Sequence, residues 1–73
     1  MNKRLVDYEK AKKYVIFDYD DEAYISGIRK NAFQMVIKKS DALVFDNFVT
    51  AEYFLRVLKE LFPDIYFRMI PLD

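Results

Sequence analysis

The order of hydrophobic and polar positions along this chain predicts a small α+β domain. The run "KYVIFDY" (13–19) is rich in β-branched and aromatic residues, and "AYISGIRK" (23–30) follows it after an acidic "DDE" turn. Two such runs separated by a short polar turn predict a β-hairpin. The stretch "DIYFRMI" (64–70) alternates apolar and polar residues, which predicts a last strand that Pro71 ends.

The segment "NFVTAEYFLRVLKELF" (47–62) carries the one clear helical period of the chain. Asn47 is a good N-cap residue and Pro63 is a stop signal. Its apolar positions on one side should pack on the sheet. These positions are Ala51, Phe54, Leu55, Leu58 and Phe62.

The region between the hairpin and the helix is less clearly patterned. Residues 31–41 fit either a third strand or an irregular connection, and "ALVFD" (42–46) predicts a short strand. The expected order is β-β-(β)-β-α-β, a mostly antiparallel sheet of three to four strands with one helix on one face. The unit 42–70 should form a right-handed crossover with its two strands parallel. Gly27, inside the second strand, predicts a bulge or a close backbone approach.

Length and composition favour one domain over residues 1–73, with residues 1–12 as a mobile basic arm or a short helix. The chain is 53% apolar and contains seven Phe and six Tyr. So many rings exceed the interior positions of a small core, so some should be exposed or covered by a partner.

Twelve basic and twelve acidic side chains cancel. A general nucleic-acid binder carries a basic excess and a DNA mimic an acidic one, so the balance favours neither. No apolar run approaches the roughly 20 residues of a membrane span. The charged N-terminal stretch lacks the apolar core of a secretory signal, so the expected location is the cytoplasm.

The Asp-x-Asp at 18–20 raises the question of phosphoryl transfer, because enzymes of the haloacid dehalogenase superfamily place such a pair at a strand end. Asp18 would be the nucleophile and Asp20 the general acid. That chemistry needs a magnesium site, a lysine and a much larger sheet. Here Asp21 and Glu22 follow, and then another strand. A solvated turn is the favoured interpretation, with a weak cation site as the alternative.

The sequence also lacks the residues that other common catalytic and metal-binding sites require. The chain has no His and no Cys, which excludes histidine-based triads, thiol nucleophiles and thiolate zinc sites. A single glycine excludes a glycine-rich phosphate loop. We expect no enzymatic activity, no cofactor and no metal.

Several segments resemble small uncharacterised proteins of bacteriophages and related mobile elements. The shared features are "YVI" (14–16), "YIS" (24–26), Phe33, "KKSDALVFDN" (38–47) and "AEYFL" (51–55). The resemblance covers about four-fifths of the chain, and Phe48 and Val49 depart from it where charged residues would be expected. It implies a protein that binds and modulates a host protein, such as a defence factor, and it transfers no functional residue.

Two surfaces are candidates for binding a partner. Val49, Tyr53 and Val57 recur at every fourth position on the side of the helix opposite its core face. On the sheet, we expect one face to pack on the helix through Val15, Phe17, Ile25, Ile65, Phe67 and Met69. The other face would then carry Tyr14, Ile16, Tyr24, Ile28 and Tyr66, with Arg68 beside them.

The sequence therefore predicts a non-enzymatic interaction module that binds a host protein, itself as a homodimer, or both. The alternative is a nucleic-acid-associated accessory protein. In that case the tyrosines would stack on unpaired bases, and Arg29, Lys30, Lys38 and Lys39 would contact phosphates or another acidic partner.

Overall fold

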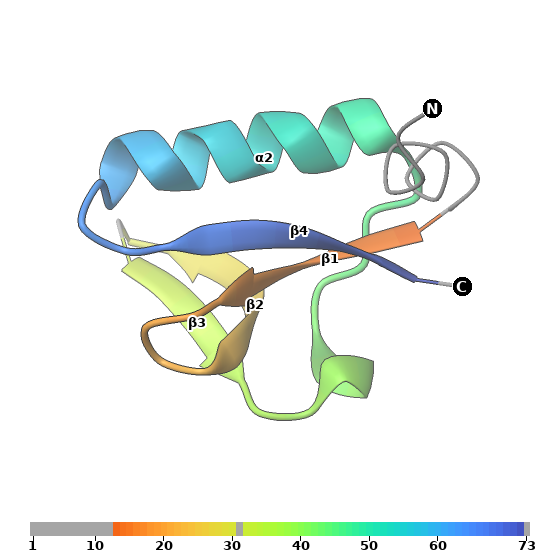
Figure 1. Ribbon diagram of the computed structural model, residues 1–73, viewed down its shortest axis with the longest axis horizontal. Coiled ribbons are helices and arrows are strands. Elements are labelled where there is room, and N and C mark those ends of the chain that lie inside the picture. The colour runs from red at the N-terminus through yellow and green to blue at the C-terminus, as the bar shows by residue number, and fades with distance from the viewer. Residues whose placement is uncertain (1–12, 31, 73) are drawn as a thin grey trace, which may run out of the picture.

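The computed structural model describes residues 13–30 and 32–72, which form one antiparallel sheet of four strands with one α-helix on one face (Figure 1). The strand order is β3-β2-β1-β4. The elements are β1 (Lys13–Asp18), β2 (Ala23–Arg29), β3 (Ala32–Val36), the short 3-10 helix η1 (Lys39–Asp41), α2 (Phe48–Leu61) and β4 (Phe67–Leu72). The predicted α+β class is confirmed. The arm or helix expected at residues 1–12 lies outside the described residues.

The first two strands form the predicted hairpin. Asp18 pairs with Ala23 and Phe17 with Tyr24, and residues 19–22 form the turn, which we call the hairpin tip. Glu22 has a φ of 51°, the left-handed conformation that tight turns often require. The region 31–41, left open by the sequence, contains β3 followed by η1.

Gly27 lies at an irregularity between β2 and β3. The register shifts between Ile25 and Gly27, which confirms the predicted bulge. A close backbone approach is not the reason for the glycine, because a Cβ there would meet only Oε1 of Gln34 at 3.8 Å.

The predicted strand at 42–46 is wrong. This segment contacts two diverging strands: the N–H groups of Tyr14 and Phe45 donate to each other's carbonyls at 2.9 and 2.8 Å, and Leu43 donates to the carbonyl of Ile25 at 3.0 Å. β1 and β2 pair directly only near their hairpin tip. The segment 42–46 therefore lies between their diverging ends, with one isolated bridge and no ladder.

The predicted parallel crossover is also wrong. β4 pairs with β1 antiparallel along its whole length, from Lys13 opposite Leu72 to Asp18 opposite Phe67. Pro71 does not end β4 but lies within it, opposite Tyr14. Because β4 is an edge strand, a residue without an N–H group is tolerated there.

Helix α2 forms where the sequence places it. Oδ1 of Asn47 accepts a hydrogen bond of 2.8 Å from the Thr50 N–H, the expected N-cap interaction. The helix ends at Leu61, and Phe62 donates its N–H to the Leu58 carbonyl at 2.8 Å. Ala51 and Leu58 are fully buried, which confirms the predicted core face of the helix.

The core lies between α2 and the sheet. Phe33 of β3 closes one end of the core. The centroid of its ring lies 4.8 Å from the ring centroid of Phe62 and 5.3 Å from that of Phe67. Phe54, on the sheet side of α2, packs 5.0 Å from the Phe45 ring. The buried cluster consists of Tyr14, Ile16, Ile25, Phe45, Ala51, Leu58, Phe67 and Met69.

The predicted facing of β1 is inverted. Ile16 lies opposite Met69 and faces α2 together with Tyr14, so Val15 and Phe17 point to the other face of the sheet. Tyr14 and Ile16 are core residues and not partner contacts. The predicted outward position of Ile28 is wrong as well. The bulge shifts the alternation, so that both Ile25 and Ile28 pack on the helix side.

In the described part of the chain, no helix is long and apolar enough to cross a membrane.

Candidate functional site

Four aromatic rings gather on the sheet face that α2 does not cover. The ring centroid of Phe17 lies 4.8 Å from that of Tyr19 and 4.9 Å from that of Tyr24, and both pairs have an edge-to-face geometry. The Tyr19 ring lies 5.2 Å from that of Tyr66. These separations are typical of favourable aromatic pairs. We call Phe17, Tyr19, Tyr24 and Tyr66 the outer aromatic surface.

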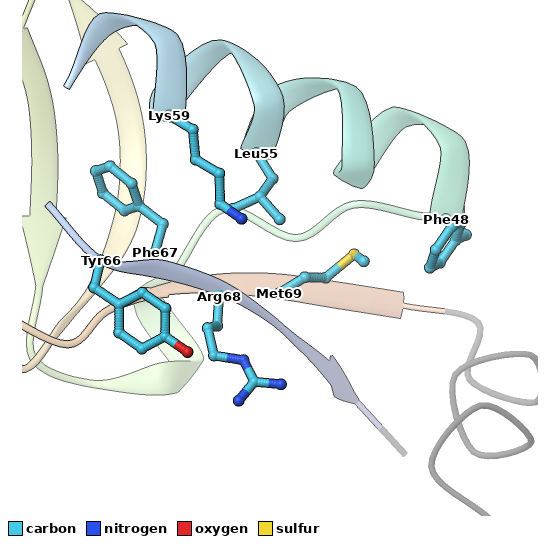
Figure 2. Close-up of a pocket in the computed structure, with 7 residues that line it drawn as sticks. All are labelled: Phe48, Leu55, Lys59, Tyr66, Phe67, Arg68 and Met69. Carbon is cyan, nitrogen blue, oxygen red and sulfur yellow. The ribbon is translucent and has the colours of Figure 1, made fainter. Parts of the chain in front are cut away.

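Strand register brings these rings together from three segments. Phe17 is opposite Tyr24 on β2 and opposite Arg68 on β4, and directly opposed residues share a face. Tyr66 precedes Arg68 by two positions, and both point away from α2, whereas Phe67 and Met69 point toward it (Figure 2).

Two of the four rings are substantially exposed. Tyr19 is 43% exposed and Tyr66 is 54% exposed, while Phe17 and Tyr24 are half-buried beneath their neighbours. The N–H of Tyr19 donates to the carbonyl of Tyr66 at 2.9 Å, which fixes the two exposed rings beside each other. The surface is thus an apolar patch with phenol groups, a combination suited to binding.

The hairpin tip beside this surface is held by carboxylates. Oδ1 of Asp18 accepts hydrogen bonds from the N–H groups of Asp20, at 2.9 Å, and Asp21, at 3.1 Å. Oδ2 of Asp20 accepts a bond of 2.7 Å from the Tyr66 N–H. Both residues of the Asp-x-Asp therefore serve the turn. Within residues 13–30 and 32–72, no group of three or more acidic side chains is arranged to hold a metal ion.

Asp18 is the buried charged residue of the described chain, with a side chain that is 0% exposed. Desolvation raises its pKa above the ordinary value, and the side chain of Asp21 adds to the rise by hydrogen bonding and like charge. The N–H groups of Asp21 and Asp20 act in the opposite direction. Oδ2 of Asp18 is buried without a hydrogen-bond partner, so the ionised form is disfavoured.

The structure assigns the predicted partner residues to different places. Tyr24, Tyr66 and Arg68 lie on the helix-free face as expected. Phe17 and Tyr19 belong to the same surface, although the sequence pattern did not identify them as outward residues. The apolar run of β1 has no alternation that identifies an outer face, and only the pairing with Arg68 and Tyr24 reveals it.

The outer helix stripe of Val49, Tyr53 and Val57 is exposed in part. Val49 is 74% and Tyr53 65% exposed, and Val57 is half-buried. Leu61, the next residue at this spacing, is also exposed. No ring of this stripe contacts another ring in the described residues, unlike those of the outer aromatic surface.

The four cations of the nucleic-acid alternative do not form one patch. Arg29 and Lys30 lie at the turn between β2 and β3. Lys38 and Lys39 follow β3 at the opposite end of that hairpin. Two separated pairs do not form the continuous basic track along which a single strand binds.

A groove runs between α2 and the edge strand β4 (Figure 2). Tyr66 and Arg68 line it and also lie on the helix-free face, so β4 connects the two surfaces. Its other lining residues are Phe48, Leu55, Lys59, Phe67 and Met69.

Comparisons with protein families, with curated proteins and with solved structures found no match to this chain.

Proposed function

We propose that this protein is a non-enzymatic interaction module that binds a partner protein through the outer aromatic surface. The observation that carries the proposal is the contact of four rings on a sheet face without a covering helix. The resemblance to bacteriophage and mobile-element proteins favours a host protein as the partner and its modulation as the outcome. The cytoplasm remains the predicted location.

The rings are poorly explained by folding alone. The core is already closed on the other face by Tyr14, Ile16 and the buried side of α2. Exposed aromatic side chains that contact one another form a contiguous apolar area, whereas single exposed apolar residues are ordinary. Large rings with few rotatable bonds lose little entropy when a partner covers them, and they are enriched at interface centres.

The hairpin tip supports the non-enzymatic part of the proposal. Asp18 would be a poor nucleophile, because it is buried, its pKa is raised and one of its oxygens holds two backbone N–H groups. Oδ2 of Asp20 accepts a hydrogen bond from the Tyr66 N–H and so also serves the turn. The Asp-x-Asp thus builds the turn that positions Tyr19 beside Tyr66.

Stacking on unpaired bases is the competing use of exposed rings. Carboxylates border these rings at the hairpin tip, where they would repel phosphates, and the basic residues lie in separate pairs. The charge distribution therefore favours a protein partner.

The proposal is tested by affinity capture from host lysate with and without nuclease, using wild type and Tyr66→Ala. Tyr66→Ala keeps the backbone groups that bond to Asp20 and Tyr19, so the tip should persist. We expect a protein captured in both conditions by wild type and at least about tenfold less by the variant, since interface aromatics often contribute about 2 kcal/mol.

Tyr53→Ala is the matched control, because Tyr53 is also an exposed tyrosine but lies on α2, which covers the other face of the sheet. Equal loss with both variants, or capture that disappears with nuclease, would overturn the proposal. Light scattering of the isolated protein shows whether a second copy is the partner, as the homodimer hypothesis requires.

A further inference from the structure

The outer aromatic surface has an acidic border on one side. Asp20, Asp21 and Glu22 are exposed at the hairpin tip, directly between Tyr19 and Tyr24 in the chain. The bond from the Tyr66 N–H to Oδ2 of Asp20 holds one of these carboxylates against the ring surface. Rings and carboxylates therefore form one continuous patch.

These carboxylates have no cationic partner in the described part of the chain. The ion pair between Arg56 and Glu52, at 3.6 Å, lies on α2 and does not involve them. Arg68 lies on the same face of the sheet, opposite Phe17. Along β4 it is therefore farther from the hairpin tip than Tyr66 is. Negative charge is therefore concentrated at the hairpin-tip end of the outer aromatic surface.

We propose that the partner docks a cationic segment, with Arg or Lys side chains, across the outer aromatic surface toward the carboxylates of the hairpin tip. This inference rests on the proposed protein-binding function and specifies the chemistry of the partner.

The chemistry of the patch favours a cation in two ways. Exposed tyrosine rings attract a guanidinium or ammonium group through their negative faces. Carboxylates at the ring border add charge complementarity, which selects cationic partners and disfavours anionic ones. Arginine suits such a place best, because its planar guanidinium stacks on a ring and also forms paired hydrogen bonds with a carboxylate.

The probe is a fluorescein-labelled peptide of alternating arginine and glycine, and the readout is fluorescence anisotropy at low salt. Its neutral analogue, with citrulline in place of arginine, keeps the shape and removes the charge. We expect the arginine peptide to bind, the citrulline peptide to bind at least about threefold more weakly, and oligothymidylate to bind more weakly than the arginine peptide.

The variant Asp21→Asn/Glu22→Gln tests the acidic border, and it leaves in place Asp18 and Asp20, which hold the turn. Asp41→Asn/Glu60→Gln changes net charge equally at exposed sites elsewhere. Thermal unfolding confirms that both fold. We expect the tip variant to weaken peptide binding about threefold or more, and the control less than about twofold.

Equal weakening by both variants, equal binding of the citrulline peptide or tighter binding of oligothymidylate would overturn this inference. If that occurs while Tyr66→Ala still abolishes partner capture, the protein-binding function stands and only the cationic partner is wrong. If partner capture survives Tyr66→Ala, the proposed function itself fails.

Discussion

The backbone N–H of Tyr66 donates a hydrogen bond of 2.7 Å to Oδ2 of Asp20, and this contact joins the start of β4 to the β1–β2 hairpin tip. The two residues are 46 positions apart in the chain. A second bond, from the Tyr19 N–H to the Tyr66 carbonyl, completes the junction. Backbone groups and a carboxylate therefore place Tyr19 and Tyr66, the two exposed rings of the proposed binding surface, beside each other.

Removing that carboxylate should loosen the junction. Asp20→Ala leaves the Tyr66 N–H to water and should lower the free energy of unfolding by about 1 kcal/mol, a usual net value for one hydrogen bond. Asp20→Asn keeps an acceptor oxygen and should lose less. Urea unfolding of the two variants measures the difference, and an Asn variant as unstable as the Ala variant would show that the hydrogen bond is not what matters.

Asp18 should give the protein an unusual pH dependence. Because burial raises its pKa in the folded state, the folded protein holds this proton more tightly than the unfolded chain. The resulting stability is fully present below the unfolded pKa of about 3.9 and is lost as pH rises through the raised value. Wild type should therefore lose stability with rising pH relative to Asp18→Asn, which cannot ionise.

The measurement is urea unfolding of wild type and Asp18→Asn from pH 3 to pH 8, a range chosen to extend beyond the ordinary aspartate pKa of about 3.9 on both sides. The difference between the two proteins cancels the contributions of the other carboxylates. Asp18→Ala serves as the control, since it removes the acceptor for the Asp20 and Asp21 N–H groups and should be destabilised throughout. A pH-independent difference between wild type and Asp18→Asn would contradict the raised pKa.

Tyr53 and Phe54, which are neighbours on α2, should contribute very different amounts to the free energy of unfolding. Tyr53 is 65% exposed, so Tyr53→Ala should change the free energy of unfolding by about 0.5 kcal/mol or less. Phe54 packs on the Phe45 ring and the core, so Phe54→Ala should cost about 3 kcal/mol. Thermal unfolding compares them directly, and a Tyr53→Ala loss as large as that of Phe54→Ala would mean that the exposed stripe also contributes to folding.

Gly27 should tolerate a side chain. Its φ is not positive, and an added Cβ meets only Oε1 of Gln34 at an ordinary 3.8 Å. Gly27→Ala should then stabilise the protein by about 0.5 kcal/mol, because alanine restricts the unfolded chain. A loss of more than about 1 kcal/mol in urea unfolding would show that the bulge requires glycine.

The elements that the sequence predicted best are those with local causes. The α2 boundaries follow from the Asn47 cap, the helical period and Pro63, all within one segment. β4 alternates, so the inward side of Phe67 and Met69 was predicted correctly.

The predictions that failed depend on contacts between distant segments. In β1 the apolar run is bounded by Lys13 and Asp18, which have opposite parity, so the polar ends do not identify a face. Only the register with β4 shows that Phe17 is outward and Ile16 inward. The segment 42–46 has strand-like residues, but its place between diverging strands is set by Tyr14 and Ile25.

The same distinction between local patterns and distant contacts explains which residues of the candidate site were predicted correctly. Tyr24, Tyr66 and Arg68 were predicted as outward residues, and the structure places them on the helix-free face. Tyr14 and Ile16 were wrongly included, because the facing of β1 was inverted. The tip junction was beyond sequence reasoning, since no spacing pattern relates Asp20 to Tyr66.

The most direct test of the account is an amide NMR titration of the ¹⁵N-labelled protein with the captured partner. The account predicts the largest shifts or broadening at the amides of Phe17, Tyr19, Tyr24 and Tyr66, on the helix-free face of the sheet. Perturbation confined to the helix stripe of Val49, Tyr53 and Val57, with these four amides unchanged, would contradict it.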